Sequence, residues 1–366
     1  MFVGYTTLRA AVSVFLVLIA AFVVTGTLSS LYRRERIELG ERRFGEGQML
    51  AARGDMEGAV DSYREALLFS PDNQQYRLSL ADGLLSIGAL DEAQAHLEQL
   101  LQSDPTNGRI NLALAQTALK RHKVNQAIDY YQRAVYEYWP PNEIPERRQA
   151  RWQLIELLEA RNQREPVVGE LIQLYASAPP DPQERSKIGF LLIRYGAISE
   201  AEQVFRNLER TYPQLVDSHR GLGLVYFASG EYVAARHEFQ HALHLSPKDK
   251  ETTELLAEAN LAIDLDPLQA GISSAERRRR SANLLNRVIT TLADCWVQRV
   301  PSPTAQHQLD EARNVLAGRH STDEDFSLTL QRAAGQLWQN RASFCPATNA
   351  PADRVVDLAV QRIGYE

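Results

Sequence analysis

The stretch GLGLVYFASGEYVAARHEFQHALHLSP, residues 221–247, contains the pattern that decides the fold. It predicts two helices joined by a short turn at Gly230, because glycine punctuates helical segments. In the second helix Ala235, Phe239 and Ala242 recur at spacings of four and three, which places them on one face. Gly223 is small where the two helices must approach closely, and the proline at 247 stops the second helix.

The same skeleton returns along the chain at a fixed period of 34 residues. Positions that share this spacing are Ala59, Ala93 and Ala127, and then Ala201 and Ala235, Phe205 and Phe239, and Pro213 and Pro247. A period of this size indicates stacked units, each of which buries its apolar face against its neighbours. The sequence therefore predicts an all-α fold built from helix pairs.

The skeleton resembles the tetratricopeptide repeat (TPR) family, whose unit has three small residues, an aromatic residue between them and a proline near its end. The resemblance covers residues 40–266, as about six units that finish with a closing helix at 250–265. The fourth unit, 142–181, is about 40 residues long and lacks the small residues, so we interpret it as degenerate. The resemblance implies a superhelical solenoid whose first helices line a concave groove.

By resemblance, the groove is the surface that binds partners. Its predicted lining mixes apolar residues with a few Arg and Gln, which suits an extended peptide or a partner helix. The residues are Phe44, Gln48, Leu78, Asp82, Arg109, Leu112 and Gln116 in the N-terminal half, and Phe190, Arg194, Arg220, Leu224 and Phe227 in the C-terminal half. Packing between repeats is the alternative role for several of them.

The N-terminal segment predicts a membrane anchor. Residues 10–32 carry no charge and are long enough to cross a bilayer as one helix, after a short tail at 1–9. A cleavable signal peptide is the alternative, although no clear cleavage site closes the stretch. We therefore expect a single-pass protein of a bacterial inner membrane.

The side of the membrane depends on two opposing signals. Five arginines between residues 33 and 43 favour a cytoplasmic domain by the positive-inside rule. The two cysteines of the chain, Cys295 and Cys345, suit an oxidising compartment. Our interpretation favours the periplasm and keeps the cytoplasm open.

Residues 267–366 predict a small C-terminal helical bundle, with helices at 273–296, 304–317 and 323–341 and a short one after Pro351. We predict a Cys295–Cys345 disulfide; two buried free thiols, or a metal or redox role, are the alternatives. The four arginines at 277–280 could bind an acidic partner or lipid head groups. A solvated charge run is the interpretation that we favour.

Residues 237–241 read HEFQH and match H-E-x-x-H, the pattern of zinc protease helices. At 100° per residue, His237, His241 and His244 fall at about 0°, 40° and −20°, whereas the apolar face of the helix lies near 160–200°. The histidines should therefore point to the solvated, convex side, and we interpret the match as chance. Surface binding of Zn²⁺ or Ni²⁺ by the exposed pair stays open, and a zinc-dependent enzyme is a remote alternative.

The bulk composition narrows the function. A net charge of −6 does not suit a nucleic-acid binder, and no phosphate-binding loop, dinucleotide fingerprint, nucleophile elbow or C-x-x-C pair occurs. No catalytic residue, metal ligand or cofactor is predicted. We expect a non-enzymatic, membrane-anchored scaffold for protein–protein interactions, acting as an accessory or assembly factor of a membrane or cell-envelope complex. A permanent structural subunit of such a complex is the alternative.

Overall fold

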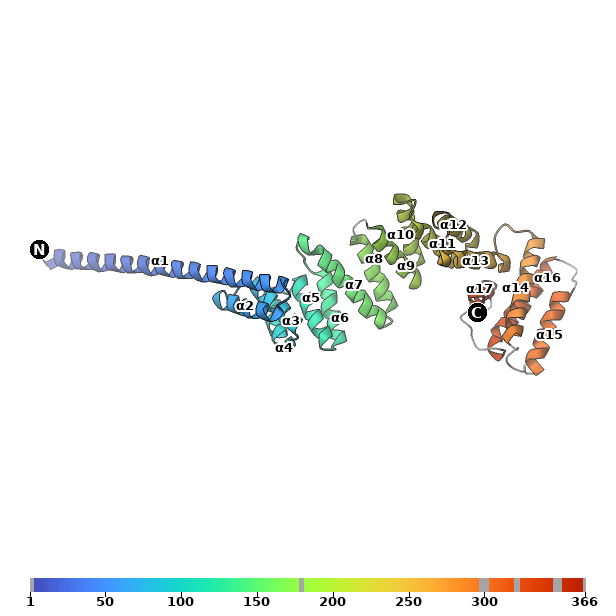
Figure 1. Cartoon of the computed structure of the whole chain (residues 1–366), viewed down its shortest axis with the longest axis horizontal. Coiled ribbons are helices and arrows are strands. Elements are labelled where there is room, and N and C mark those ends of the chain that lie inside the picture. Colours follow the sequence, from blue (N-terminus) through green and yellow to red (C-terminus); the bar gives the residue numbers. More distant parts are fainter. Residues whose placement is uncertain (1–2, 178–180, 296–302, 319–322, 345–350, 365–366) are drawn as a thin grey trace. The chain divides into compact units, whose positions relative to one another are not determined.

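The computed structural model describes the chain except residues 1–2, 178–180, 296–302, 319–322, 345–350 and 365–366. The side chains of residues 3–14, 17, 295, 323–325, 343 and 351–353 are also outside the description. Within the described residues every regular element is a helix, which confirms the predicted all-α class (Figure 1). The helices form two compact units, Met1–Ser177 and Ala178–Glu366.

The first unit contains four helix pairs in chain order. They are α1 (Val3–Ala52) with α2 (Met56–Phe69), α3 (Gln74–Ile87) with α4 (Leu90–Ser103), α5 (Gly108–Lys120) with α6 (Val124–Tyr136), and α7 (Ile144–Ala160) with α8 (Arg164–Ser177). A single 3₁₀ turn, η1 (Pro141–Glu143), lies between α6 and α7. Each helix pair also packs on the next pair, as the repeat predicts.

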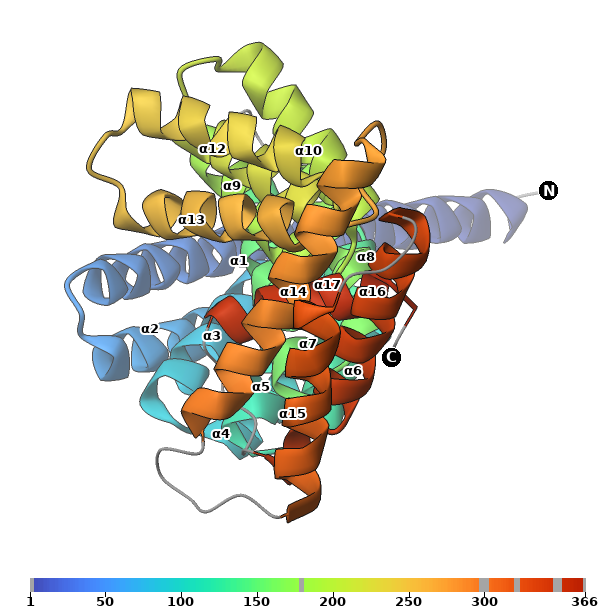
Figure 2. The ribbon, with the colours of Figure 1, turned by 90° about the vertical axis from the view of Figure 1, so that its right-hand side faces the viewer.

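The second unit contains two helix pairs and the C-terminal helices. The pairs are α9 (Pro182–Arg194) with α10 (Ile198–Thr211) and α11 (Val216–Ala228) with α12 (Tyr232–Leu245), followed by α13 (Lys250–Leu265). The remaining elements are α14 (Ser274–Cys295), α15 (Pro303–Ala317), α16 (Asp323–Gln339), the short η3 (Arg341–Ser343) and α17 (Pro351–Arg362). All four predicted C-terminal helices are therefore present, and α14, α15 and α16 lie side by side (Figure 2).

The turn inside every helix pair needs one residue with a positive φ angle. The residue is glycine at 54, 88, 196 and 230, where φ lies between 69° and 86°. In the third and fourth pairs His122 (φ 59°) and Asn162 (φ 56°) take the same place. Glycine adopts this left-handed conformation without a steric penalty, whereas a residue with a Cβ atom does so at a cost. Every repeat therefore needs the same turn conformation, and the third and fourth repeats adopt it with a non-glycine residue at an energetic cost.

The two helices of a repeat approach closely where a glycine faces an aromatic ring sixteen residues later. A Cβ atom at Gly223 would lie 2.4 Å from the ring of Phe239, and one at Gly189 would lie 2.6 Å from the ring of Phe205. Both rings are fully buried, and burial of such a side chain stabilises the fold by about 1.5–3 kcal/mol. The close approach predicted at Gly223 is confirmed.

The degenerate fourth unit fills this contact with different side chains. At the positions that precede Gly189 and Phe205 by 34 residues stand Ile155 and Leu171, and both are fully buried. A larger residue on the first helix is thus matched by a smaller one on the second, and exchanges that conserve volume cost little. The extra length of this unit lies in η1 and in α7, which has 17 residues.

The C-terminal helices share one apolar core with the last repeat. Phe227 and Phe239 of that repeat belong to the same cluster as Leu284 of α14, Leu330 of α16 and Val356 of α17. The predicted boundary at 266/267 therefore falls inside the second compact unit. The predicted disulfide lies outside the described residues, because neither Cys345 nor the side chain of Cys295 is described.

The N-terminal segment is a continuous helix that runs directly into the first repeat. Helix α1 extends from Val3 to Ala52 without a break. Among the residues that the structure describes, no helix combines the length and apolar character needed to span a bilayer. This finding does not support the transmembrane segment predicted at 10–32, of which the side chains of residues 10–14 and 17 are not described.

Candidate functional site: a groove along the first helices

A cavity of about 340 Å³ lies among the helices of the first unit. Helices α3, α5 and α7 and the segment before η1 supply its lining, which is Asp82, Leu85, Ser86, Arg109, Leu112, Ala113, Gln116, Lys120, Trp139 and Glu146. Four of the predicted groove residues, Asp82, Arg109, Leu112 and Gln116, thus lie around one hollow.

An ion-pair network orders the polar side of this cavity. Nη2 of Arg109 lies 3.2 Å from Oδ2 of Asp82, and its Nη1 lies 3.3 Å from Oε1 of Glu143. Burial raises the pKa of the Asp82 carboxyl above its ordinary value, although Arg109 opposes the shift. Burial would lower the pKa of Arg109, but the two carboxylates outweigh it and raise that pKa. The arginine is therefore a fixed cation at the edge of the groove.

The other side of the cavity is apolar, with polar groups at its rim. Leu112 and Gln116 are half-buried, one turn apart on α5. Lys120 follows one turn later and donates from Nζ to the carbonyl oxygen of Leu85 at 2.8 Å. A peptide lying along α5 would meet an apolar side chain, an amide and an ammonium group in that order, and all three can contact an extended chain.

Trp139 forms one wall of the cavity and was not predicted. Its Nε1 donates to the carbonyl oxygen of Ala134 at 2.6 Å, and the side chain is buried. The ring lies where a Cβ atom at position 108 would stand, so Gly108 is required for this packing. The late proline of the third unit, at 140 rather than 139, is the signal in the sequence that this junction differs.

Two further lining residues could have been predicted from the sequence pattern. Ser86 and Lys120 are 34 residues apart, and each follows a predicted groove residue, Asp82 or Gln116, by one helical turn. Extending the predicted stripe by one more turn would have included both.

The predicted groove residues nearest the N-terminus do not join this cavity. The prediction for Phe44 is wrong, because its ring is buried against Tyr76 and Tyr63, with centroids 4.5 Å and 5.5 Å away. Leu78 is half-buried and packs against the same apolar cluster, whereas Gln48 is exposed on α1. The first repeat thus uses its aromatic residue for the core, which is the alternative left open for this set.

In the second unit the predicted residues divide between a charged cluster and the core. Arg220 forms ion pairs with Asp217 and Glu251, both at 2.8 Å, and its guanidinium lies 5.1 Å from the centroid of the Phe190 ring. Arg194 is exposed. These side chains are accessible along α9 and α11, but Arg220 is already held by carboxylates of its own unit.

The prediction for Phe227 as a groove residue is wrong. Its ring is 8% exposed, lies 5.2 Å from the ring of Tyr232, and belongs to the core that the C-terminal helices share. Leu224 packs against the same core. The guanidinium of Arg354, from α17, lies 6.0 Å from the Phe227 ring. The C-terminal helices therefore cover side chains that the repeat pattern places on the predicted groove.

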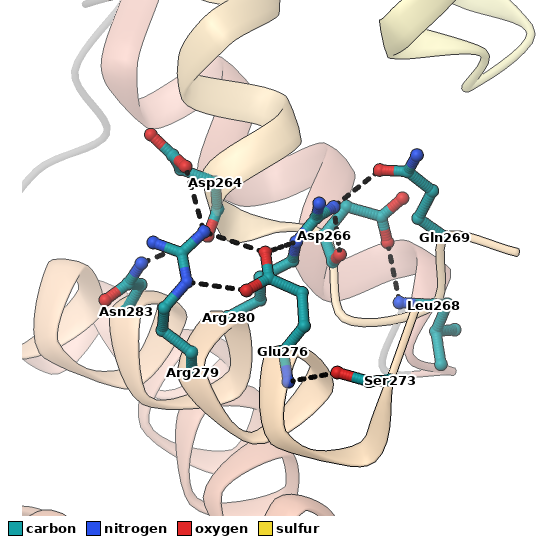
Figure 3. Close-up of polar contacts among 9 residues, drawn as sticks. All are labelled: Asp264, Asp266, Leu268, Gln269, Ser273, Glu276, Arg279, Arg280 and Asn283. Carbon is teal, nitrogen blue, oxygen red and sulfur yellow. Dashed lines mark hydrogen bonds and ion pairs between the residues drawn. The ribbon is translucent and has the colours of Figure 1, made fainter. Parts of the chain in front are cut away.

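The arginine run on α14 is partly built into the fold. Arg279 donates to both carboxylate oxygens of Glu276, at 2.8 Å and 2.7 Å, and lies 3.6 Å from Asp264 (Figure 3). Arg280 is buried and donates to Glu276, to the carbonyl oxygen of Asp266 and to Gln269. Both arginines join the start of α14 to the end of α13. The solvated charge run therefore describes Arg279, which is 54% exposed, but not the buried Arg280.

The H-E-x-x-H histidines lie on the exposed side of α12, as the helical wheel predicts. His237, His241 and His244 are exposed, while the opposite face is fully buried. Glu238 turns inward instead, and its Oε2 lies 2.9 Å from Nδ1 of the buried His219. The glutamate and the histidines of the pattern therefore do not converge in a substrate cleft, which a zinc protease requires.

Two family descriptions match parts of this chain. "Cytochrome c-type biogenesis protein H TPR domain" matches residues 46–143, which contain the first-unit cavity, and "Tetratricopeptide repeat" matches residues 192–250.

Curated relatives share the repeats but are much longer. "Cellulose synthase 1 operon protein C" of Komagataeibacter xylinus is 26% identical over 257 residues, covering 62% of this chain and 18% of the relative. "Tetratricopeptide repeat protein 21A" of Mus musculus is 31% identical over 106 residues, covering 29% of this chain and 8% of the relative. The chain thus spans less than a fifth of each of these proteins.

Among solved structures, YrrB, described as "a TPR protein with an unusual peptide-binding site", is similar to this chain at 16% sequence identity. The match covers 53% of this chain and 97% of YrrB, with a TM-score of 0.40. The repeat spacing, the helix pairs and the two family matches carry the assignment. Residues 46–143 and 192–250 of this chain are therefore tetratricopeptide repeats.

Proposed function

We propose that this chain is a non-enzymatic scaffold that binds an extended segment of a partner protein in the groove of its first unit. TPR proteins act as scaffolds for protein interactions. The observation that carries the proposal is the cavity along α5, where Leu112, Gln116 and Lys120 follow one another at single turns beside the fixed charge of Arg109. Its volume of about 340 Å³ is at the lower end of the range for small-molecule pockets, which suits one side chain of a longer peptide.

A selection of peptides would test this groove. Random peptides displayed on phage would be selected on the immobilised full chain, and the enriched peptides would be measured by fluorescence anisotropy. Leu112→Glu and Gln116→Ala should each weaken binding about tenfold or more, because each changes a group in the centre of the contact. Gln132→Ala is the matched control, since Gln132 is exposed on α6. Peptides that bind both variants and the wild type equally would contradict the proposal.

We further propose that α1 anchors the scaffold to a bacterial inner membrane, with the periplasm favoured over the cytoplasm. The support is an apolar segment of α1 that is exposed on all sides, for which Phe15, Leu18, Phe22, Leu28 and Leu31 have exposed fractions of 59% or more. Exposed apolar area of this extent marks a surface that another apolar phase or partner covers.

Vesicle flotation would show whether a lipid bilayer or a protein partner covers this apolar segment. The full chain should float with vesicles of bacterial phospholipid, and Phe22→Glu should reduce the floating fraction because a carboxylate in the apolar phase is costly. Leu68→Glu is the control, since Leu68 on α2 is 73% exposed. A chain that stays at the bottom of the gradient in every variant would require a protein partner instead.

The role as accessory or assembly factor of a membrane or envelope complex is also a proposal. It is supported by the description of the family that matches residues 46–143, which concerns cytochrome c biogenesis, and by the relative from a cellulose synthase operon. A permanent subunit is the alternative. An assembly factor should leave the purified complex, whereas a permanent subunit should remain in it at one copy per complex.

A further inference from the structure

Three side chains of types that bind metals meet where the last two repeats stack. They are Glu209 near the end of α10, His219 on α11 and Glu238 on α12, and one ligand atom of each lies within 4.8 Å of the other two. His219 is 5% exposed, and both glutamates are half-buried. The proposed peptide groove lies in the first unit and uses none of these residues.

The contacts of His219 place one of its ring nitrogens inside the cluster. Its Nε2 lies 3.2 Å from the carbonyl oxygen of Pro213, and its Nδ1 lies 2.9 Å from Oε2 of Glu238. In the tautomer that donates from Nε2 to Pro213, Nδ1 has a free lone pair for a metal ion.

The surroundings match a histidine that ligates a metal. Such a histidine normally donates its second ring nitrogen to a carbonyl or a carboxylate, which fixes the ring, and Pro213 provides this contact. Ligand atoms of a tetrahedral zinc ion stand about 3.3–3.6 Å apart when each is about 2.0–2.2 Å from the metal. The Nδ1–Oε2 distance of 2.9 Å would therefore widen slightly around the ion, and a rotation of the flexible Glu209 side chain would bring the third ligand in.

The donor set favours zinc. One imidazole nitrogen and two carboxylate oxygens, with water in the fourth position, suit Zn²⁺ better than Ca²⁺ or Mg²⁺, which prefer oxygen alone.

We propose that Glu209, His219 and Glu238 bind one Zn²⁺ ion. The ion joins α10, α11 and α12, so its role is to fix the stacking of the last two repeats. An ion that binds only the folded state raises the melting temperature in proportion to the logarithm of its concentration.

Isothermal titration of ZnCl₂ into the full, tag-free chain, freed of metal with EDTA, tests the site. One ion should bind per chain, and the melting temperature should rise with zinc. Glu209→Gln and Glu238→Gln should each weaken binding at least tenfold. Both keep the side-chain volume, and the amide of the second can still donate to His219. Circular dichroism without metal would verify that each variant is folded.

Two controls separate this site from surface binding. Glu202→Gln makes the same change on α10 at an exposed position and should leave zinc affinity unchanged. His244→Ala removes an exposed histidine of α12 and should also leave it unchanged. Loss of binding in His237→Ala together with full binding in Glu209→Gln would overturn the proposal in favour of the exposed pair His237 and His241. The absence of stoichiometric binding would also overturn it.

Discussion

Arg151 and Glu170 form a buried ion pair that joins the two helices of the degenerate repeat. Nη1 of Arg151 donates to Oε2 of Glu170 at 3.0 Å, and the side chains are 5% and 9% exposed. Arg151 also donates to the carbonyl oxygen of Val135 at 3.2 Å, and the hydroxyl of Tyr136 donates to Glu170 at 2.7 Å. The pair therefore also fixes this repeat on α6, the second helix of the repeat before it.

Glu170→Ala should lower the free energy of unfolding by about 3–5 kcal/mol, because it leaves the buried guanidinium without its carboxylate. Urea denaturation followed by circular dichroism would measure the loss. Replacing both partners, as Arg151→Met with Glu170→Leu, should cost much less. Glu202→Ala is the surface control; its exposed pair with Arg206 should contribute less than about 1 kcal/mol. Equal losses for Glu170→Ala and the double variant would contradict this account.

Gly223→Ala should destabilise the fifth and sixth repeats by about 1–3 kcal/mol, since the new methyl group would overlap the buried ring of Phe239. Thermal melting of the full chain would detect the change. The control is Gly169→Ala on α8, where a Cβ atom meets nothing within 4 Å. That change should stabilise its helix by about 0.5–1 kcal/mol. A neutral Gly223→Ala would mean that the ring can move aside.

His122→Gly should stabilise the third repeat by about 1 kcal/mol, because glycine adopts the positive φ angle of this turn without strain. The measurement is the midpoint of urea unfolding. Lys123→Gly tests the neighbouring position, where φ is −92°. There the substitution should destabilise, since it only adds freedom to the unfolded chain. If both variants lost stability alike, strain at His122 would be excluded.

Glu276→Gln should lower the melting temperature most above pH 4.5. Hydrogen bonds from Arg279 and then from Arg280 lower the pKa of Glu276 from 4.5 to about 2 in the folded chain. A carboxyl with a lowered pKa stabilises the fold above its unfolded value and loses that contribution as pH falls through the folded value. The difference from wild type should therefore shrink between pH 4.5 and about 2. A difference that is independent of pH would show that the glutamate acts only by packing.

The fold could be predicted from the sequence wherever a repeat position needs one particular side chain. The 34-residue spacing of small and aromatic residues, as at Gly223 and Phe239, follows from a close approach that few residues permit. The fourth repeat hid the same contact, because Ile155 and Leu171 fill the volume in the opposite order. A pattern of residue types detects the contact between a glycine and an aromatic ring, and it misses the contact between Ile155 and Leu171.

The candidate site was predictable only in part. The stripe of Asp82, Arg109, Leu112 and Gln116 followed from helical spacing, and one cavity contains all four. Phe44 and Phe227 lie on corresponding helix faces but are buried, Phe44 against Tyr63 and Tyr76 of its own and the next repeat and Phe227 in the core shared with the C-terminal helices. Nothing in the spacing reveals that the C-terminal helices share a core with Phe227, since that contact joins segments far apart in the chain.

Helix α1 has a mechanical consequence, because it has no joint between its exposed apolar segment and the first repeat. Its 50 residues span about 75 Å at 1.5 Å per residue. A membrane or partner that binds the apolar segment therefore also determines the angle, around the axis of α1, at which the groove of the first unit faces. One residue inserted after Arg36 would swing that groove by about 100° around the helix axis, whereas seven would return it to within about 20°. The number of residues between the apolar segment and the first repeat therefore determines the direction from which a partner must approach the groove.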